Sequence, residues 1–196
     1  MDFKKRMAEE VEEMLRHKYI ESEKAGRDLG EECLARWPSE HGEAWRIGFN
    51  RRNMMDLGNG KKPVYFGVFL DDESRARIME KFGGHIPEGW KTVCSHCTLS
   101  FGDPSGNREV FDYIAEFLGR TVEMEIVSLG VSDEAVALGV DGNIRTRNAV
   151  PHITLAIPVG GRPVNSNKID NWRDTGERLA VRGVVDSYPS HFGWQH

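Results

Sequence analysis

The chain lacks a long apolar run among its 196 residues. No segment approaches the roughly 20 apolar residues that cross a bilayer, so we expect no membrane partner. Residues 1–19 also lack the apolar core of a signal peptide, because acidic residues interrupt them. These absences predict a cytoplasmic or otherwise reducing location.

Cysteine is scarce, with three residues in the whole chain. An odd number, two of them three positions apart, does not form a disulfide framework. Cys94 and Cys97 could suggest zinc or redox chemistry. However, the pair stands alone, Cys33 is far away in the sequence, and in a strand the two side chains would face opposite sides. We therefore expect no metal and no cofactor. Cys94, on the face of His96 in such a strand, could line a pocket there or be buried structurally.

An excess of positive charge is also missing, since the formal net charge is −5. Residues 1–62 carry 13 Lys and Arg against 13 Asp and Glu, whereas the remaining residues carry 13 against 18. A surface that grips long RNA or DNA is normally basic. If the protein meets nucleic acid, the balance favours an RNA end or a small nucleotide over a long duplex.

The N-terminal third reads as helical. Residues 1–24 carry apolar side chains at spacings of three and four, which predict an amphipathic helix: Phe3, Met7, Val11, Met14, Leu15 and Tyr19. Residues 27–36 continue it or form a second helix. The stretch 38–62 is less regular and ends in a cluster typical of a linker. We expect a helical extension over 1–60 and a separate domain over 61–196.

The second part alternates strands and helices, which predicts an α+β class. Strands are expected over 63–70, 91–101, 121–130, 134–140, 149–158 and 179–186, and helices over 72–82 and 107–118. Asp71 or Asp72 is expected to cap the first helix and Ser105 the second. Residues 159–176 are rich in Gly, Pro and Asn and predict a loop, with a short helix near Trp172.

Two tetrapeptides share one form, His96-Cys97-Thr98-Leu99 and His152-Ile153-Thr154-Leu155. Side chains of a strand alternate faces, so each histidine shares a face with the threonine two positions later. The residues between and after them are apolar and suit a packed core. A single His-x-Thr is more often an ordinary strand, but two copies followed by Leu predict a common groove.

Two imidazoles and two hydroxyls in one groove can act on a phosphodiester. A neutral histidine can take a proton from water or a ribose hydroxyl, and a protonated one can give a proton to the leaving oxygen. The hydroxyls of Thr98 and Thr154 can donate to phosphate oxygens. The motifs therefore indicate His96 and His152 as catalytic residues and the threonines as phosphate-binding residues.

These motifs resemble those of the two-histidine (2H) phosphoesterases, over about residues 63–188. Within that superfamily the chain is most similar to the cyclic phosphodiesterase domain of fungal and plant tRNA ligases. That similarity is carried by the stretches 86–90 (IPEGW), 150–154 (VPHIT) and 163–167 (PVNSN). It implies a two-lobed fold, with a central groove between antiparallel sheets, helices outside and an N-terminal helical extension.

The resemblance also implies a reaction. A 2′,3′-cyclic phosphate on an RNA end or nucleotide would be opened by water to a 2′-phosphate, without a metal, in RNA repair or tRNA splicing. An RNA-repair enzyme would be an implied partner. By analogy His96 would protonate the departing 3′ oxygen and His152 would activate the water, although the near symmetry of the motifs leaves this division open.

Other residues are weaker candidates for substrate contacts. They are Tyr65 and Phe66 for base stacking, Arg145 and Arg147 for phosphate, and Ser166 and Asn167 for phosphate or ribose. For each, an ordinary role is the alternative: core packing for one of the two aromatic residues, a solvated strand face for the arginines, and a turn for the last two.

Other functions remain open. The same histidines could hydrolyse a 2′,5′-linked oligonucleotide or an ADP-ribose cyclic phosphate. A third hypothesis is a non-catalytic adaptor that binds a nucleotide without turnover. The intact His and Thr of both motifs favour an enzyme.

Overall fold

The computed structural model describes residues 3–58 and 60–193, with side chains from residue 5 onward. Phe3, expected on the apolar face of the first helix, has its side chain outside the described part. The fold divides into two compact units, Met1–Lys62 and Pro63–His196.

The first unit consists of the helices α1 (Phe3–Ala25), α2 (Gly30–Glu40) and α3 (Gly42–Asn53). Its buried side chains are Cys33, Trp37, Phe49 and Met54. The expectation of an irregular stretch from residue 38 was wrong, because α3 runs through it and stacks Trp45 on Phe49 with ring centroids 5.2 Å apart. No helix within the described ranges is long and apolar enough to cross a bilayer.

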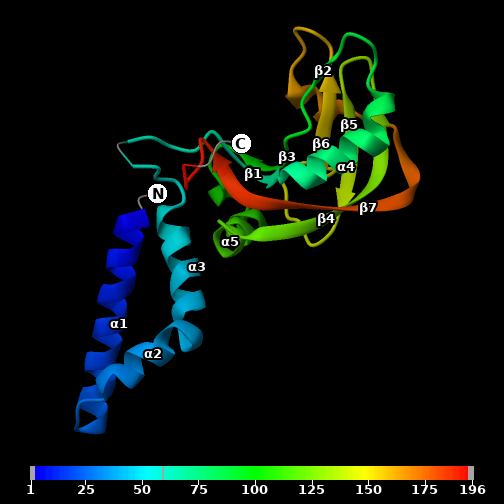
Figure 1. Cartoon of the computed structure of the whole chain (residues 1–196). Coiled ribbons are helices and arrows are strands. Elements are labelled where there is room, and N and C mark those ends of the chain that lie inside the picture. Colours follow the sequence, from blue (N-terminus) through cyan, green and yellow to red (C-terminus); the bar gives the residue numbers. More distant parts are fainter. Residues whose placement is uncertain (1–2, 59, 194–196) are drawn as a thin grey trace. The chain divides into compact units, whose positions relative to one another are not determined.

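The second unit is built on one antiparallel sheet (Figure 1). Its strands are β1 (Tyr65–Leu70), β2 (Lys91–Thr92), β3 (His96–Phe101), β4 (Thr121–Val131), β5 (Val136–Asp141), β6 (His152–Ile157) and β7 (Trp172–Tyr188). The order is β2-β6-β3-β1-β7-β4-β5, and β6 also pairs with β5. That last pairing closes the six long strands into a ring. The α+β class is confirmed, whereas the division into two lobes stays a prediction.

Two helices of this unit begin at side-chain caps. The Asp71 side chain accepts a hydrogen bond of 2.7 Å from the Ser74 amide and starts α4 (Asp72–Phe82), as expected. Asn107 caps α5 (Arg108–Phe117), because its side-chain oxygen accepts from the Val110 amide at 3.2 Å. The expectation of Ser105 as the cap was wrong. Ser105 lies in a short 3₁₀ helix, η2 (Pro104–Gly106), and another 3₁₀ helix, η1 (Gly83–His85), follows α4.

The expected strand over 91–101 is interrupted. Cys94 has a φ of +37°, a left-handed backbone conformation, and lies between the end of β2 and the start of β3. The expected loop over 159–176 contains a 3₁₀ helix, η3 (Pro163–Lys168), and β7 begins at Trp172. The last strand therefore spans 17 residues, more than twice the range expected from its apolar segment.

Candidate active site

The two tetrapeptides lie on neighbouring strands. β3 pairs antiparallel with β6, with Cys97 opposite Ile153. Both of these side chains are fully buried in the core. Alternation along each strand therefore places the histidine and threonine of each motif on the other face of the sheet.

That face borders a cavity of about 330 Å³. His96, Thr98, His152 and Thr154 all line it. The remaining lining residues come from β1, from the segments around β3 and β6, and from η3: Tyr65, Val93, Phe101, Asn148, Arg162, Pro163, Val164, Ser166 and Asn167. The structure thus brings both motifs to one space of the size expected for a small ligand.

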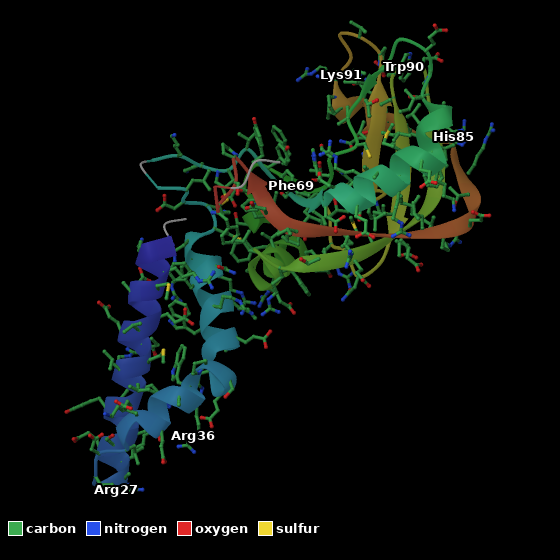
Figure 2. All side chains as sticks on the ribbon, viewed as in Figure 1. Arg27, Arg36, Phe69, His85, Trp90 and Lys91 are labelled. Carbon is green, nitrogen blue, oxygen red and sulfur yellow. The ribbon has the colours of Figure 1, made fainter. Side chains whose placement is uncertain are left out.

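His96 is held by a hydroxyl and by aromatic rings. Its Nδ1 lies 2.8 Å from Ser95 Oγ. Its ring stacks on Tyr65 with centroids 4.8 Å apart and contacts Phe69, which Figure 2 labels on β1, at 5.3 Å. These contacts fix the plane of the imidazole, and the side chain remains half-buried beside the cavity.

His152 is more deeply placed, with 6% of its surface exposed. Its Nδ1 lies 2.8 Å from the carbonyl oxygen of Val150, and its ring lies 5.9 Å from that of Trp172 on β7. Burial lowers the pKa of His152, and the hydrogen bond to the Val150 carbonyl opposes that shift. The two histidines therefore have different surroundings, although their motifs are nearly identical.

Ser166 lies between the second histidine and its threonine. Its Oγ is 2.8 Å from His152 Nε2 and 2.9 Å from Thr154 Oγ1, and the residue is 1% exposed. The helix η3 that carries Ser166 is tied to Glu134, which accepts from Asn165 at 3.3 Å and from Lys168 at 3.0 Å. Ser166 is therefore a fixed part of the site.

Tyr65 and Phe66 take opposite faces of β1. Tyr65 lines the cavity and is half-buried, and burial raises its pKa to about 12. Phe66 is fully buried and contacts the ring of His191 at 5.9 Å. The suggestion that Phe66 contacts a base was wrong, because the alternation of the strand turns it into the core.

Arg145 and Arg147 do not share a strand face, since they lie in the loop before β6. Arg145 is exposed and does not line the main cavity. Arg147 donates from its side chain to the Asp103 carbonyl at 3.3 Å and lines a neighbouring cavity of about 250 Å³, which also borders His152, Ser166 and Asn167. Asn167 lines both cavities.

Neither cysteine of the C-x-x-C pair borders the main cavity. Cys94 precedes β3 and is buried, so the suggestion that it lines the pocket was wrong. Burial raises the pKa of Cys94 to about 11 and that of Cys97 to about 12. Within the described ranges, no three His, Cys, Asp or Glu side chains gather as a set of metal ligands.

Sequence reasoning missed several residues of the cavity wall. Phe101 ends β3 and is 73% exposed, and Asn148 and Arg162 lie in the loops before and after β6. Their positions two to seven residues from the tetrapeptides were the only available signal. The pairing of β3 with β6 and the course of η3 decide which loop side chains reach the cavity.

No protein-family model matches this chain, and no curated protein matches it. Among solved structures, the chain is similar to the crystal structure of a fungal RNA kinase, with a TM-score of 0.42 and 14% sequence identity. The similarity covers 85% of this chain and 51% of the other, so this chain spans about half the length of that one.

Proposed function

We propose that this protein is a metal-independent cyclic phosphodiesterase of the two-histidine type. It hydrolyses a 2′,3′-cyclic phosphate on an RNA end or nucleotide to a 2′-phosphate. The observation that carries the proposal is the convergence of His96, Thr98, His152 and Thr154 on one cavity from two paired strands.

The chemistry follows from these groups. One imidazole removes a proton from water while the other protonates the ribose oxygen that leaves phosphorus. The threonine hydroxyls donate to the phosphate oxygens as negative charge builds on them. Tyr65 and the exposed ring of Phe101 offer faces on which a base can stack. A two-lobed 2H fold is part of this proposal.

The direct test is incubation of the full chain with each 2′,3′-cyclic nucleotide in excess EDTA, with the product identified by NMR or chromatography. We expect a nucleoside 2′-phosphate, and no product from a variant with both histidines replaced by alanine. Activity that disappears in EDTA and returns with zinc or manganese would contradict a metal-independent reaction. Nucleotide binding without turnover of any cyclic or 2′,5′-linked phosphodiester would favour the adaptor hypothesis.

A further inference from the structure

The hydrogen-bond partners around His152 favour one arrangement of its protons. The carbonyl of Val150 can only accept, so the nitrogen 2.8 Å from it, Nδ1, must carry a hydrogen. The carbonyl of Pro163 can also only accept, and Ser166 Oγ lies 2.7 Å from it. The single hydrogen of the Ser166 hydroxyl is therefore donated to Pro163.

Ser166 has no second hydrogen for its other two neighbours. It must accept from Thr154 Oγ1 at 2.9 Å and from His152 Nε2 at 2.8 Å, which uses both lone pairs of its oxygen. Nε2 then carries a hydrogen as well as Nδ1. In this arrangement His152 is an imidazolium, and each of the four short contacts contains one hydrogen.

A neutral His152 would leave one of these contacts without a hydrogen. Two acceptor atoms would then face each other at hydrogen-bond distance inside a buried site, which is unfavourable. Below the pKa of His152 all four contacts are satisfied. Above it, one contact has no hydrogen: the contact of Nδ1 with Val150 in one tautomer, and a contact of Ser166 with Pro163 or with Nε2 in the other.

Other groups around His152 act against the cation. Burial of the ring lowers its pKa, and Arg162 on the main cavity and Arg147 on the neighbouring one are both positive. His96 faces the same cavity from β3, and Cys97, also on β3, stays a neutral thiol. β5 and β7 contribute Gly139 and Trp172, which do not titrate. No carboxylate lines either cavity among the described residues, so Ser166 and Val150 are the groups that stabilise the protonated ring.

We propose that Ser166 is a positioning residue that stabilises the imidazolium of His152, and that His152 is the proton donor while His96 is the base. The second half rests on the proposed function. Water bonds to phosphorus and gives its proton to His96 Nε2. The bond between phosphorus and the ribose oxygen breaks, and that oxygen keeps the electron pair. It replaces Ser166 as the acceptor of the His152 Nε2 proton, while the Thr154 hydroxyl turns from Ser166 to a phosphate oxygen. Exchange with solvent resets both rings.

His96 can take the role of base in one of its two tautomers. When its Nδ1 donates to Ser95 Oγ at 2.8 Å, Nε2 is the acceptor nitrogen of the neutral ring and can take a proton. This division of labour is the reverse of the one that the family resemblance implies. It is proposed from the difference between the two histidines, because Ser95 contacts one of them at Nδ1 and Ser166 contacts the other at Nε2.

The first test needs no activity. The full chain with ¹⁵N-labelled histidine is titrated by NMR in wild type, Ser166→Ala, Ser166→Cys and, as a control, Ser95→Ala. His152→Ala identifies the His152 signals. We expect Ser166→Ala to move the His152 midpoint to lower pH by roughly one unit, because an acceptor for the cation is lost. Ser166→Cys, with a weaker acceptor of similar volume, should move it in the same direction. Ser95→Ala should leave it in place.

The sign of this shift decides the role of Ser166. If Ser166 donated to a neutral ring, its removal would raise the His152 midpoint. A rise or an unchanged midpoint in both Ser166 variants therefore overturns the proposal. Because the titration uses substrate-free protein, it gives an answer whether or not the protein hydrolyses a phosphodiester.

The second test identifies the proton donor. Thymidine 5′-(p-nitrophenyl phosphate) releases nitrophenolate, which leaves without a proton. With this substrate His152→Ala should lose less than about 10-fold in kcat/KM, whereas His96→Ala should keep a loss of about 10²–10⁴-fold. The opposite pattern overturns the assignment. If wild type hydrolyses neither this ester nor any cyclic phosphate, the proposed function fails together with the division of labour, and the NMR result still decides the role of Ser166.

Discussion

At the scale of single residues, the two histidines are the groups whose loss should matter most. Replacing His96 or His152 with alanine should lower kcat for a 2′,3′-cyclic nucleotide by about 10²–10⁴-fold, the usual contribution of a general acid or base. The kcat of the double variant should be only slightly below that of the less active single variant, because both groups act in one displacement. Thr98→Ala or Thr154→Ala should cost less, since one hydroxyl still holds the phosphate. Steady-state kinetics on these variants check this.

Nucleotide binding provides the control for these variants. The threonines and the cavity wall remain after either histidine is removed, so calorimetric affinity for a nucleoside 2′-phosphate should change far less than kcat. Equal losses of affinity and turnover would show that the histidines hold the ligand and do not move protons.

The cysteines of the motif region should be unreactive. Cys94 and Cys97 are buried, and burial raises their pKa to about 11 and about 12, so almost no thiolate exists near neutral pH. Folded protein treated with iodoacetamide at about pH 8 should show neither residue alkylated by peptide mass spectrometry. The same treatment in denaturant should alkylate both. Rapid alkylation of Cys94 or Cys97 in the folded protein would contradict this expectation and would support zinc or redox chemistry at the pair.

At the scale of elements, the contact between β1 and β3 sets the position of the first histidine. Gly67 lies where the register of the two strands shifts. A Cβ there would lie 3.0 Å from the Cys97 carbonyl oxygen and 3.3 Å from His96 Cδ2. Gly67→Ala should therefore push β1 from β3, lower stability by about 1–3 kcal/mol and displace His96. Chemical denaturation and kcat should both show the effect.

Gly106→Ala is the matched control for this change. A Cβ at Gly106, in η2, meets no heavy atom within 4 Å, so stability and kcat should stay near those of wild type. If Gly67→Ala leaves stability and kcat near those of wild type, as this control does, the expected clash between β1 and β3 is absent and the prediction is wrong.

Most elements of the second unit could be predicted because their signals are local. The apolar run of β6 and the Asp71 cap of α4 are readable in the sequence itself. The left-handed backbone conformation of Cys94 could not be predicted, because cysteine has no preference for a positive φ and the surrounding fold imposes it. The helix α3 was missed because it contains glycines and many charges, and packing of Trp45 and Phe49 decides its conformation.

The candidate site also combines residues with a local sequence signal and residues whose position depends on the fold. Two repeated tetrapeptides indicated His96 and His152 before any fold was known. The contact of Ser166 with both His152 and Thr154 could not be predicted, since it spans 14 and 12 residues and depends on the path of η3. Ser166 appeared in the sequence only as one polar residue of a turn.

At the scale of the whole molecule, the charge distribution limits the substrate. Residues 63–196 carry 13 Lys and Arg against 18 Asp and Glu, so we expect this unit not to attract a long polyanion. Raising salt from about 50 to about 200 mM should change kcat/KM for a cyclic mononucleotide by less than about 3-fold, because few counterions are released. With an RNA strand that ends in a 2′,3′-cyclic phosphate, a fall of about 10³-fold over the same range would instead show many phosphate contacts and a long RNA substrate. Kinetics at constant pH across the salt range measure this.

The division into two units makes a final prediction about where the activity resides. Every residue that lines the main cavity lies between Tyr65 and Asn167, within the unit Pro63–His196. That unit has its own buried core and a sheet closed by the β5–β6 pairing, the properties of a segment that folds alone. Residues 63–196 expressed alone should unfold cooperatively and keep kcat for a cyclic mononucleotide within about 3-fold of the full chain. Circular dichroism and kinetics test both. A folded but inactive fragment would show that residues 1–62 complete the site, whereas an unfolded fragment would show that they complete the core.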